Sequence, residues 1–203
     1  MKLFFLPGTC SLSPHIALRE AGIPFELVRV GRKDKQTTDG EDFLGINPKG
    51  MVPALRLDDG AVLTEGPAIV QYIADLKPES NLAPANGTLA RYRLQETLNF
   101  LSTEVHKGFS PLFNPKTPED YRVLAKDLLA ARFALLEARL AQSPFLMGDT
   151  FTVADGYLFT MLGWAPHARV DLAPWPGLQA YRARIAARPA VVAAMTAEGL
   201  LKP

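Results

Sequence analysis

The sequence contains a single cysteine, Cys10, among 203 residues. One cysteine excludes an internal disulfide framework and a metal site built from cysteines alone. The three histidines, His15, His106 and His167, are widely spaced and no H-E-x-x-H motif occurs, so resident-metal chemistry has no support. Because its one thiol is unpaired, we expect the chain in a reducing cytoplasm.

An excess of one charge is also lacking, since 22 Lys and Arg oppose 21 Asp and Glu for a net charge of +1. We therefore expect no binding to nucleic acid or to an anionic membrane surface. The longest stretches without charged residues, 3–18 and 156–168, are broken by glycine and proline and are shorter than the ~20 apolar residues of a spanning helix. The apolar run at the N-terminus ends at Pro7, too early for an export signal.

Motifs for nucleotide binding and serine hydrolysis are missing too, because the sequence has no Walker lysine motif, no G-x-G-x-x-G and no G-x-S-x-G. What remains is ordinary globular composition, with 48% hydrophobic and 21% charged residues. The length of 203 residues corresponds to one large domain or two small ones.

Up to about residue 76, short apolar runs alternate with turn signals. A strand, a helix and a second strand in succession favour a parallel pair with a right-handed crossover. The Asp-Gly pair at 59–60 predicts a hairpin, because it supplies the positive φ of tight turns. The predicted elements are strands over 2–6, 25–30, 52–57 and 61–64, and helices over 13–21 and 67–76.

Residues 77–84 contain proline and serine and read as a linker, so we expect domains over 1–80 and 85–203. Beyond the linker the periodicity is helical. A narrow apolar stripe appears within about 60° at 100° per residue; its members are Leu94, Leu98, Leu101 and Val105. Further helices are predicted over 119–140, 152–164, 178–187 and 190–197.

Cys10 lies between the end of a strand and the start of a helix, where unpaired N–H groups and the helix dipole favour a thiolate. The dipole alone contributes too little to ionise a thiol fully, so direct donors are needed. The pattern C-S-L-S is also a one-cysteine version of the C-x-x-C redox motif, and a redox role would require a mixed disulfide with a small thiol. An inert buried cysteine is the alternative.

Two further stretches combine turn residues with polar groups. In the run from Asn47 to Pro53, the proline at the start of a strand suits an edge strand or a cis peptide that exposes the Val52 backbone. At 64–66, Gly66 allows an anion to approach the backbone N–H, and Glu65 can pair with an amine. An ordinary loop and plain helix capping are the alternatives.

Two features fall in the helical half. Asn99, Thr103 and His106 lie within about 60° of one another, opposite the apolar stripe, with Lys107 beside them. They are either a solvated face, or His106 and Lys107 donate to a thiolate or carboxylate. The T-V-A-D sequence at 152–155 is a variant of the capping box and is expected to be structural. Gly156 leaves that cap without the usual apolar staple.

Together these motifs resemble the bacterial beta-class glutathione S-transferases over nearly the whole chain. The resemblance rests on Cys10, N-P-K-G-M-V-P-A-L at 47–55, T-E-G at 64–66, E-V-H-K-G-F at 104–109 and F-T-V-A-D-G-Y-L-F at 151–159. It implies a thioredoxin-like α/β N-terminal domain of the order βαβ-ββα and an all-helical C-terminal domain. It also implies a homodimer that binds glutathione between the two domains, with glutathione as co-substrate and no cofactor or metal.

The resemblance assigns roles to individual positions. Cys10 matches the cysteine close to the glutathione sulfur, Val52 pairs with the cysteinyl part, and Glu65 and Gly66 hold the γ-glutamyl end. Lys35 matches a contact to the glycyl carboxylate. The contacts from the helical domain match Asn99, Thr103 and His106, and an apolar electrophile site is expected to be lined by Phe109, Phe113, Trp164 and His167.

The resemblance also predicts the reaction. The activity expected is conjugation of the glutathione thiolate to a hydrophobic electrophile, with attack on a peroxide oxygen as a possible second reaction, and Cys10 and His106 as the catalytic residues. A glutathione-dependent thiol-disulfide oxidoreductase using Cys10 and a non-catalytic binding protein for hydrophobic compounds are the alternatives.

Overall fold

The computed structural model describes residues 1–201, which form two compact units. The first, here called the N-terminal unit, comprises Met1–Ala83 and the segment from Ala187 onward. The second, here called the helical unit, is Pro84–Ala186. The first boundary lies at the end of the stretch that reads as a linker in the sequence.

The N-terminal unit is built on a mixed sheet of four strands in the order β2-β1-β3-β4. The strands are β1 (Lys2–Phe5), β2 (Glu26–Arg29), β3 (Ala54–Arg56) and β4 (Val62–Thr64). β1 pairs with β2 in parallel and with β3 antiparallel, and β3 pairs with β4 antiparallel. The parallel pair and the hairpin predicted from the sequence are both confirmed.

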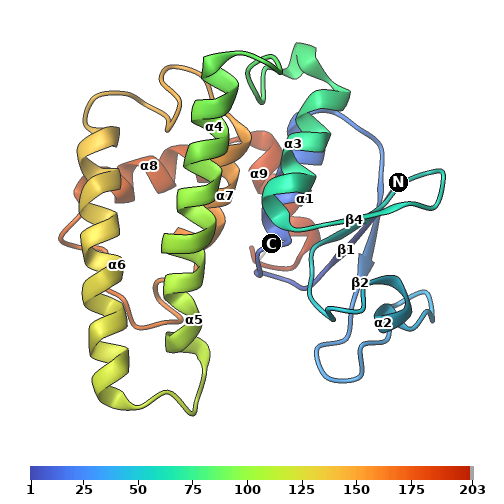
Figure 1. Cartoon of the computed structure of the whole chain (residues 1–203), viewed down its shortest axis with the longest axis horizontal. Helices are drawn as coiled ribbons and strands as arrows, with labels where there is room; N and C mark the ends of the chain where they lie inside the picture. Colours follow the sequence, from blue (N-terminus) through green and yellow to red (C-terminus); the bar gives the residue numbers. More distant parts are fainter. Residues whose placement is uncertain (202–203) are drawn as a thin grey trace. The chain divides into compact units, whose positions relative to one another are not determined.

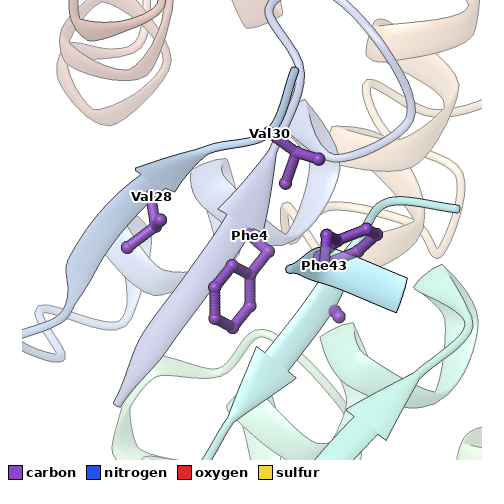
Figure 2. Close-up of a cluster of buried hydrophobic side chains, with 5 residues drawn as sticks. Phe4, Val28, Val30 and Phe43 are labelled. Atoms are coloured by element: carbon purple, nitrogen blue, oxygen red, sulfur yellow. The ribbon is translucent and has the colours of Figure 1, made fainter. Parts of the chain in front are cut away.

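The two faces of the sheet carry different layers, because successive side chains of a strand point to opposite sides. One face packs on α2 (Phe43–Ile46), where the rings of Phe4 and Phe43 lie 5.7 Å apart (Figure 2). The other face is covered by α1 (Leu12–Glu20) and α3 (Gly66–Leu76), which pack against each other (Figure 1). The α/β architecture expected for this part of the chain is confirmed.

The last helix of the chain, α9 (Pro189–Ala197), packs on α1. Its flanks are tied to the same helix, since Arg188 pairs with Glu20 at 2.6 Å and Glu198 with His15 at 2.9 Å. The structure therefore groups this segment with the N-terminal unit, which differs from the division at 85–203 expected from the sequence. Partners about 170 residues apart leave no local sign in the sequence.

The helical unit consists of helices in succession. They are α4 (Leu89–Phe100), the π-helical segment η2 (Leu101–His106), α5 (Lys107–Phe113), α6 (Glu119–Leu140), α7 (Val153–Leu162) and α8 (Pro176–Ala186). The apolar stripe predicted on the first of them is confirmed, because Leu94, Leu98, Leu101 and Val105 are all buried. Every residue of α7 is buried as well, so this helix is the core of the unit.

A capping box starts α7, as the sequence predicts. Asp155 accepts hydrogen bonds from the Thr152 N–H at 2.7 Å and the Leu146 N–H at 2.8 Å. It also accepts one from the Tyr181 hydroxyl of α8 at 2.8 Å. This carboxylate thus joins three segments of the helical unit. Within residues 1–201, no helix is long and apolar enough to span a membrane.

Candidate active site

The loop between β1 and α1 holds Cys10 just before the first helical turn. The Leu6 N–H donates to the Ser11 hydroxyl at 3.2 Å, and that hydroxyl donates to the Leu6 carbonyl at 3.1 Å, so the two ends of the loop are tied together. The partly exposed Cys10 thiol donates to the Val52 carbonyl at 3.2 Å. Because only a protonated thiol can donate, the sulfur is neutral in this arrangement.

Residues 47–53 form the loop that brings Val52 to Cys10. Asn47 is buried and donates from Nδ2 to the Met51 carbonyl at 2.7 Å, which fixes the curvature of the loop. The Val52–Pro53 peptide bond is cis, one of the two conformations that the sequence allows at this proline. Asn47, a turn residue in the sequence, thus orients the backbone that meets the thiol.

Lys35 reaches the same loop from the segment that precedes α2. Its φ of 57° is left-handed, a conformation that a residue other than glycine adopts only where its surroundings hold it. Its ammonium group donates to the Gly50 carbonyl at 2.9 Å, two residues before Val52. Three of the residues expected at the site, Cys10, Lys35 and Val52, therefore lie around one loop.

Glu65 and Gly66 lie where α3 begins. Glu65 has φ 70° and ψ 117°, a strained conformation of the kind that clusters at functional sites. Its carboxylate pairs with the Lys49 ammonium at 2.5 Å, and that ammonium also donates to the Thr64 hydroxyl at 2.8 Å. The N–H groups of Ala68 and Ile69 already donate to the Glu65 carbonyl, at 3.1 and 3.0 Å, and a proline at position 67 has no N–H. The Gly66 N–H is therefore the donor of the first turn that can meet an anion.

Lys49 has no role in the sequence-based assignment, although it stands in the N-P-K-G-M-V-P run. Both Lys49 and Glu65 are largely exposed, so their ion pair contributes little to stability. The pair instead links the loop of Val52 to the start of α3. The available signal was a lysine in a turn and a glutamate 16 residues later, and it is a weak one.

In the helical unit, His106 ends the π-helical segment η2. The Lys107 N–H donates to the Ser102 carbonyl five residues earlier, the hydrogen bond of a π turn. A π turn holds more residues than an α turn, so the angle of 100° per residue behind the prediction is only approximate in η2, although Leu101 and Val105 are buried as it predicts. Asn99 and Thr103 are exposed, whereas His106 is half-buried.

The imidazole of His106 is held by two aromatic residues of the same unit. Its Nδ1 lies 2.7 Å from the hydroxyl oxygen of Tyr157 in α7. The ring of Trp164 meets it edge-on, with centroids 4.9 Å apart. Tyr157 was missed by the sequence reasoning, because a tyrosine in an apolar helix reads as core.

The aromatic residues expected to line the electrophile site form one cluster with one exception. Phe109 and Phe113 stack at 6.2 Å, and Trp164 meets both rings edge-on. Phe109 is fully buried, so it supports the other two rings and offers no surface of its own, while Phe113 is 48% exposed. His167 is the exception, since it is exposed and lies outside these ring contacts. Residues 1–201 contain no cluster of His, Cys, Asp and Glu that could hold a metal ion.

Comparison with known proteins gives the same family at both ends of the chain. Residues 8–76 match the family model of the glutathione S-transferase N-terminal domain, and residues 100–189 match that of the C-terminal domain. The chain is 46% identical over 200 residues to the glutathione S-transferase GstA of Escherichia coli O157:H7, which covers 98% of this chain and 100% of that protein.

Two solved structures share the fold over their whole length. The sphingomonad glutathione S-transferase complexed with glutathione matches with a TM-score of 0.95 and 52% identity, over 99% of this chain and 100% of that one. The beta-class glutathione S-transferase of Sphingomonas chungbukensis matches with a TM-score of 0.95 and 50% identity, over the same shares. The chain therefore belongs to the glutathione S-transferase family, as an enzyme of the bacterial beta class.

Proposed function

We propose that this transferase conjugates the glutathione thiolate to small hydrophobic electrophiles, with Cys10 and His106 as its catalytic residues. The observation that carries the proposal is the 3.2 Å hydrogen bond between the Cys10 thiol and the Val52 carbonyl. It brings together the two groups assigned to the cysteinyl part of glutathione. A thiol at that point can donate to the glutathione sulfur once the peptide is bound.

The ends of glutathione are assigned to two charged side chains and one backbone N–H of the N-terminal unit. Glu65 would take the γ-glutamyl amine and Gly66 the α-carboxylate, as acceptor and donor respectively. In this structure the Glu65 carboxylate is paired with Lys49, so the amine has to share or replace that ammonium. Lys35 would donate to the glycyl carboxylate, since an ammonium has three N–H groups and one is directed to Gly50.

The reaction follows from the assigned groups. The glutathione sulfur attacks the electrophilic carbon, a C–S bond forms, and the leaving group departs with its electron pair. Donors to the sulfur from Cys10 and His106 would favour the thiolate that attacks. With a peroxide the same sulfur attacks an oxygen, an S–O bond forms as the O–O bond breaks, and the alkoxide leaves and takes up a proton. A second glutathione then attacks the sulfenic acid, so that a disulfide forms and water leaves. This is the second reaction we propose for the site. Asn99, Thr103, Phe113, Trp164 and His167 are proposed contacts of the helical unit, with Phe109 behind them.

Replacing Cys10 with alanine separates this proposal from a thiol-disulfide oxidoreductase. Because glutathione supplies its own nucleophile, we expect conjugation to fall by no more than about tenfold, the worth of one hydrogen bond. Exchange with a disulfide through a mixed disulfide at Cys10 is expected to be lost. The rate with an aryl halide measures conjugation, and the rate with a small disulfide measures disulfide exchange. Cys10→Ser, which keeps a hydrogen-bond donor, is the matched control. Complete loss of conjugation in Cys10→Ala would show that Cys10 reacts covalently in the transfer.

Replacing His106 with alanine is expected to lower kcat by about 10²-fold, within the range that a positioned acid–base group contributes. The KM for glutathione should change much less, because the N-terminal unit carries the charged contacts to its ends. Steady-state kinetics with glutathione as the varied substrate test this. Unchanged kcat contradicts the catalytic role of His106.

We also propose that two copies of the chain associate, with α6 contributing to the contact. Its exposed apolar residues recur at spacings of three, four and seven; they are Tyr121, Leu124, Leu128 and Leu135. The buried residues of the same helix, such as Leu129 and Phe133, lie on a different side, so this seam is additional to the core.

Replacing Leu128 with glutamate should therefore convert a dimer into single chains in sizing chromatography with light scattering. Val123 is an exposed apolar residue of α6 that falls outside the seam, so Val123→Glu is the matched control and is expected to stay dimeric. If Leu128→Glu forms a dimer as stable as that of the wild-type protein, the proposal that α6 contributes to the contact is wrong. A cytoplasmic location is proposed as well, because a sequence with one cysteine cannot form an internal disulfide.

A further inference from the structure

The imidazole of His106 has a defined neighbour on its Nδ1 side. Tyr157 is 2% exposed, and its hydroxyl oxygen lies 2.7 Å from Nδ1. The two rings are nearly perpendicular, at 80°, with centroids 5.9 Å apart. The ring of Trp164 approaches the same imidazole at 4.9 Å. One hydrogen bond and two ring contacts therefore fix how the imidazole is turned.

The two elements that supply this contact differ: α7, which carries Tyr157, is a fully buried helix, and η2, which carries His106, is a π-helical segment. Tyr157 lies in the middle of α7, whose residues are all buried, so its hydroxyl has a fixed position. His106 comes from the π turn of η2, a type of turn that is frequent at functional sites. The wider turn sets His106 against α7 and away from a regular helical stripe.

We propose that Tyr157 is a positioning residue that fixes the tautomer of His106. A phenol with an ordinary pKa of about 10 keeps its proton at neutral pH, so the hydroxyl can donate to Nδ1. An Nδ1 that accepts carries no proton, and the neutral imidazole then bears its proton on Nε2. Nε2–H is the kind of donor that a histidine needs to stabilise a thiolate. This inference rests on the role proposed above for His106.

The same hydroxyl also accommodates a charged imidazole. If His106 gains a proton, Nδ1–H donates and the hydroxyl oxygen of Tyr157 accepts, because a phenol does both. The contact is therefore kept while the proton state of the ring changes. A phenylalanine at position 157 would keep the ring packing, but it could neither donate a hydrogen bond to Nδ1 nor accept one from it.

Nitrogen-15 NMR of the imidazole rings tests the tautomer directly. The chain has three histidines, and comparison with His106→Gln identifies the signals of His106. In the wild-type protein, at a pH where the His106 ring is neutral, we expect the proton on Nε2 and an unprotonated Nδ1. In Tyr157→Phe we expect both tautomers. A wild-type ring with its proton on Nδ1 overturns the proposal without any variant at position 157.

Kinetics supply the second readout. Tyr157→Phe should lower kcat about tenfold, the factor that corresponds to one hydrogen bond, with less than a twofold change in the KM for glutathione. Tyr181→Phe is the matched control, because it also removes a buried hydroxyl of this unit, bonded to Asp155 at 2.8 Å. We expect it to lower Tm and to leave kcat and the His106 signals unchanged.

The two variants at the histidine and the tyrosine separate the possible failures. Unchanged kinetics in His106→Ala would refute the role of His106 proposed above. The positioning role alone would be refuted if His106→Ala lowers kcat while Tyr157→Phe changes neither kcat nor the tautomer of His106. If Tyr181→Phe slows kcat as much as Tyr157→Phe, the effect is general loosening of the helical unit and the proposal is wrong.

Discussion

Replacing Asp155 with alanine is expected to cost the protein about 3–5 kcal/mol of unfolding free energy, the cost of breaking a buried charged network. Four buried donors lose their acceptor, namely the N–H groups of Leu146 and Thr152 and the hydroxyls of Thr152 and Tyr181. Each buried donor left without a partner costs about 1–3 kcal/mol. Since whole domains are stable by only about 5–15 kcal/mol, this is a large fraction.

The measurement is thermal unfolding followed by circular dichroism, with an expected fall in Tm of about 10 °C or more. Asp149 lies in an exposed turn near the same segment, so Asp149→Ala is the matched control and should unfold within about 2 °C of the wild-type protein. A fall in Tm no larger for Asp155→Ala than for this control would contradict the structural role of the carboxylate.

Asp155→Asn separates the effect of the side chain's charge on stability from the effect of its shape. Burial raises the pKa of the Asp155 carboxyl, and the four hydrogen bonds that it accepts oppose that shift. The negative charge is therefore itself costly in this position. Asparagine keeps one acceptor oxygen and removes the charge, so we expect about half the loss of Asp155→Ala.

The capping box shows what local sequence can predict. The T-V-A-D pattern at 152–155 identifies the start of a helix, because the residues that bond are three apart in the chain. The apolar stripe of α4 and the hairpin turn at 59–60 are predictable for the same reason. None of these patterns reveals that Tyr181 completes the site of Asp155 from another helix.

The contacts around the candidate catalytic residues could not be predicted from the sequence, for two different reasons. Periodicity predicts that Leu101 and Val105 of η2 are buried, but it gives no sign of the π turn that ends at Lys107 and sets the direction of His106. The partners of Glu65 and His106, which are Lys49 and Tyr157, come from other elements and depend on tertiary packing. Residue types marked Cys10, Val52 and Glu65 as candidates, but only the folded chain shows the bond from Cys10 to Val52.

The same limit applies to the C-terminal segment, where Glu198 meets the start of the chain. Its carboxylate accepts the Gly8 N–H at 2.9 Å, two residues before Cys10, and bonds His15 Nδ1 at 2.9 Å. The Arg19 Nε–H donates to His15 Nε2 at 2.9 Å, so Nε2 carries no proton and Nδ1–H is the donor to Glu198. The side chains of His15 and Glu198 are fully buried.

Glu198→Ala leaves a buried imidazole N–H and a loop N–H without their acceptor, and we expect a loss of about 3–5 kcal/mol in unfolding free energy. Faster hydrogen exchange at Gly8 should accompany that loss, because the loop of Cys10 loses its anchor. Glutathione binding is expected to weaken in the same variant, although Glu198 is not assigned to the ligand.

Denaturant unfolding and amide exchange measure these effects. Thr196→Ala is the control, because its exposed hydroxyl donates to the Val192 carbonyl of its own helix, at 2.8 Å. Glu198→Gln, which keeps an acceptor oxygen, should fall between the two. If Gly8 exchanges at the wild-type rate in Glu198→Ala while the protein is destabilised, then Glu198 holds α9 to α1 without ordering the loop of Cys10. Because α1 begins directly after that loop, we expect both effects together.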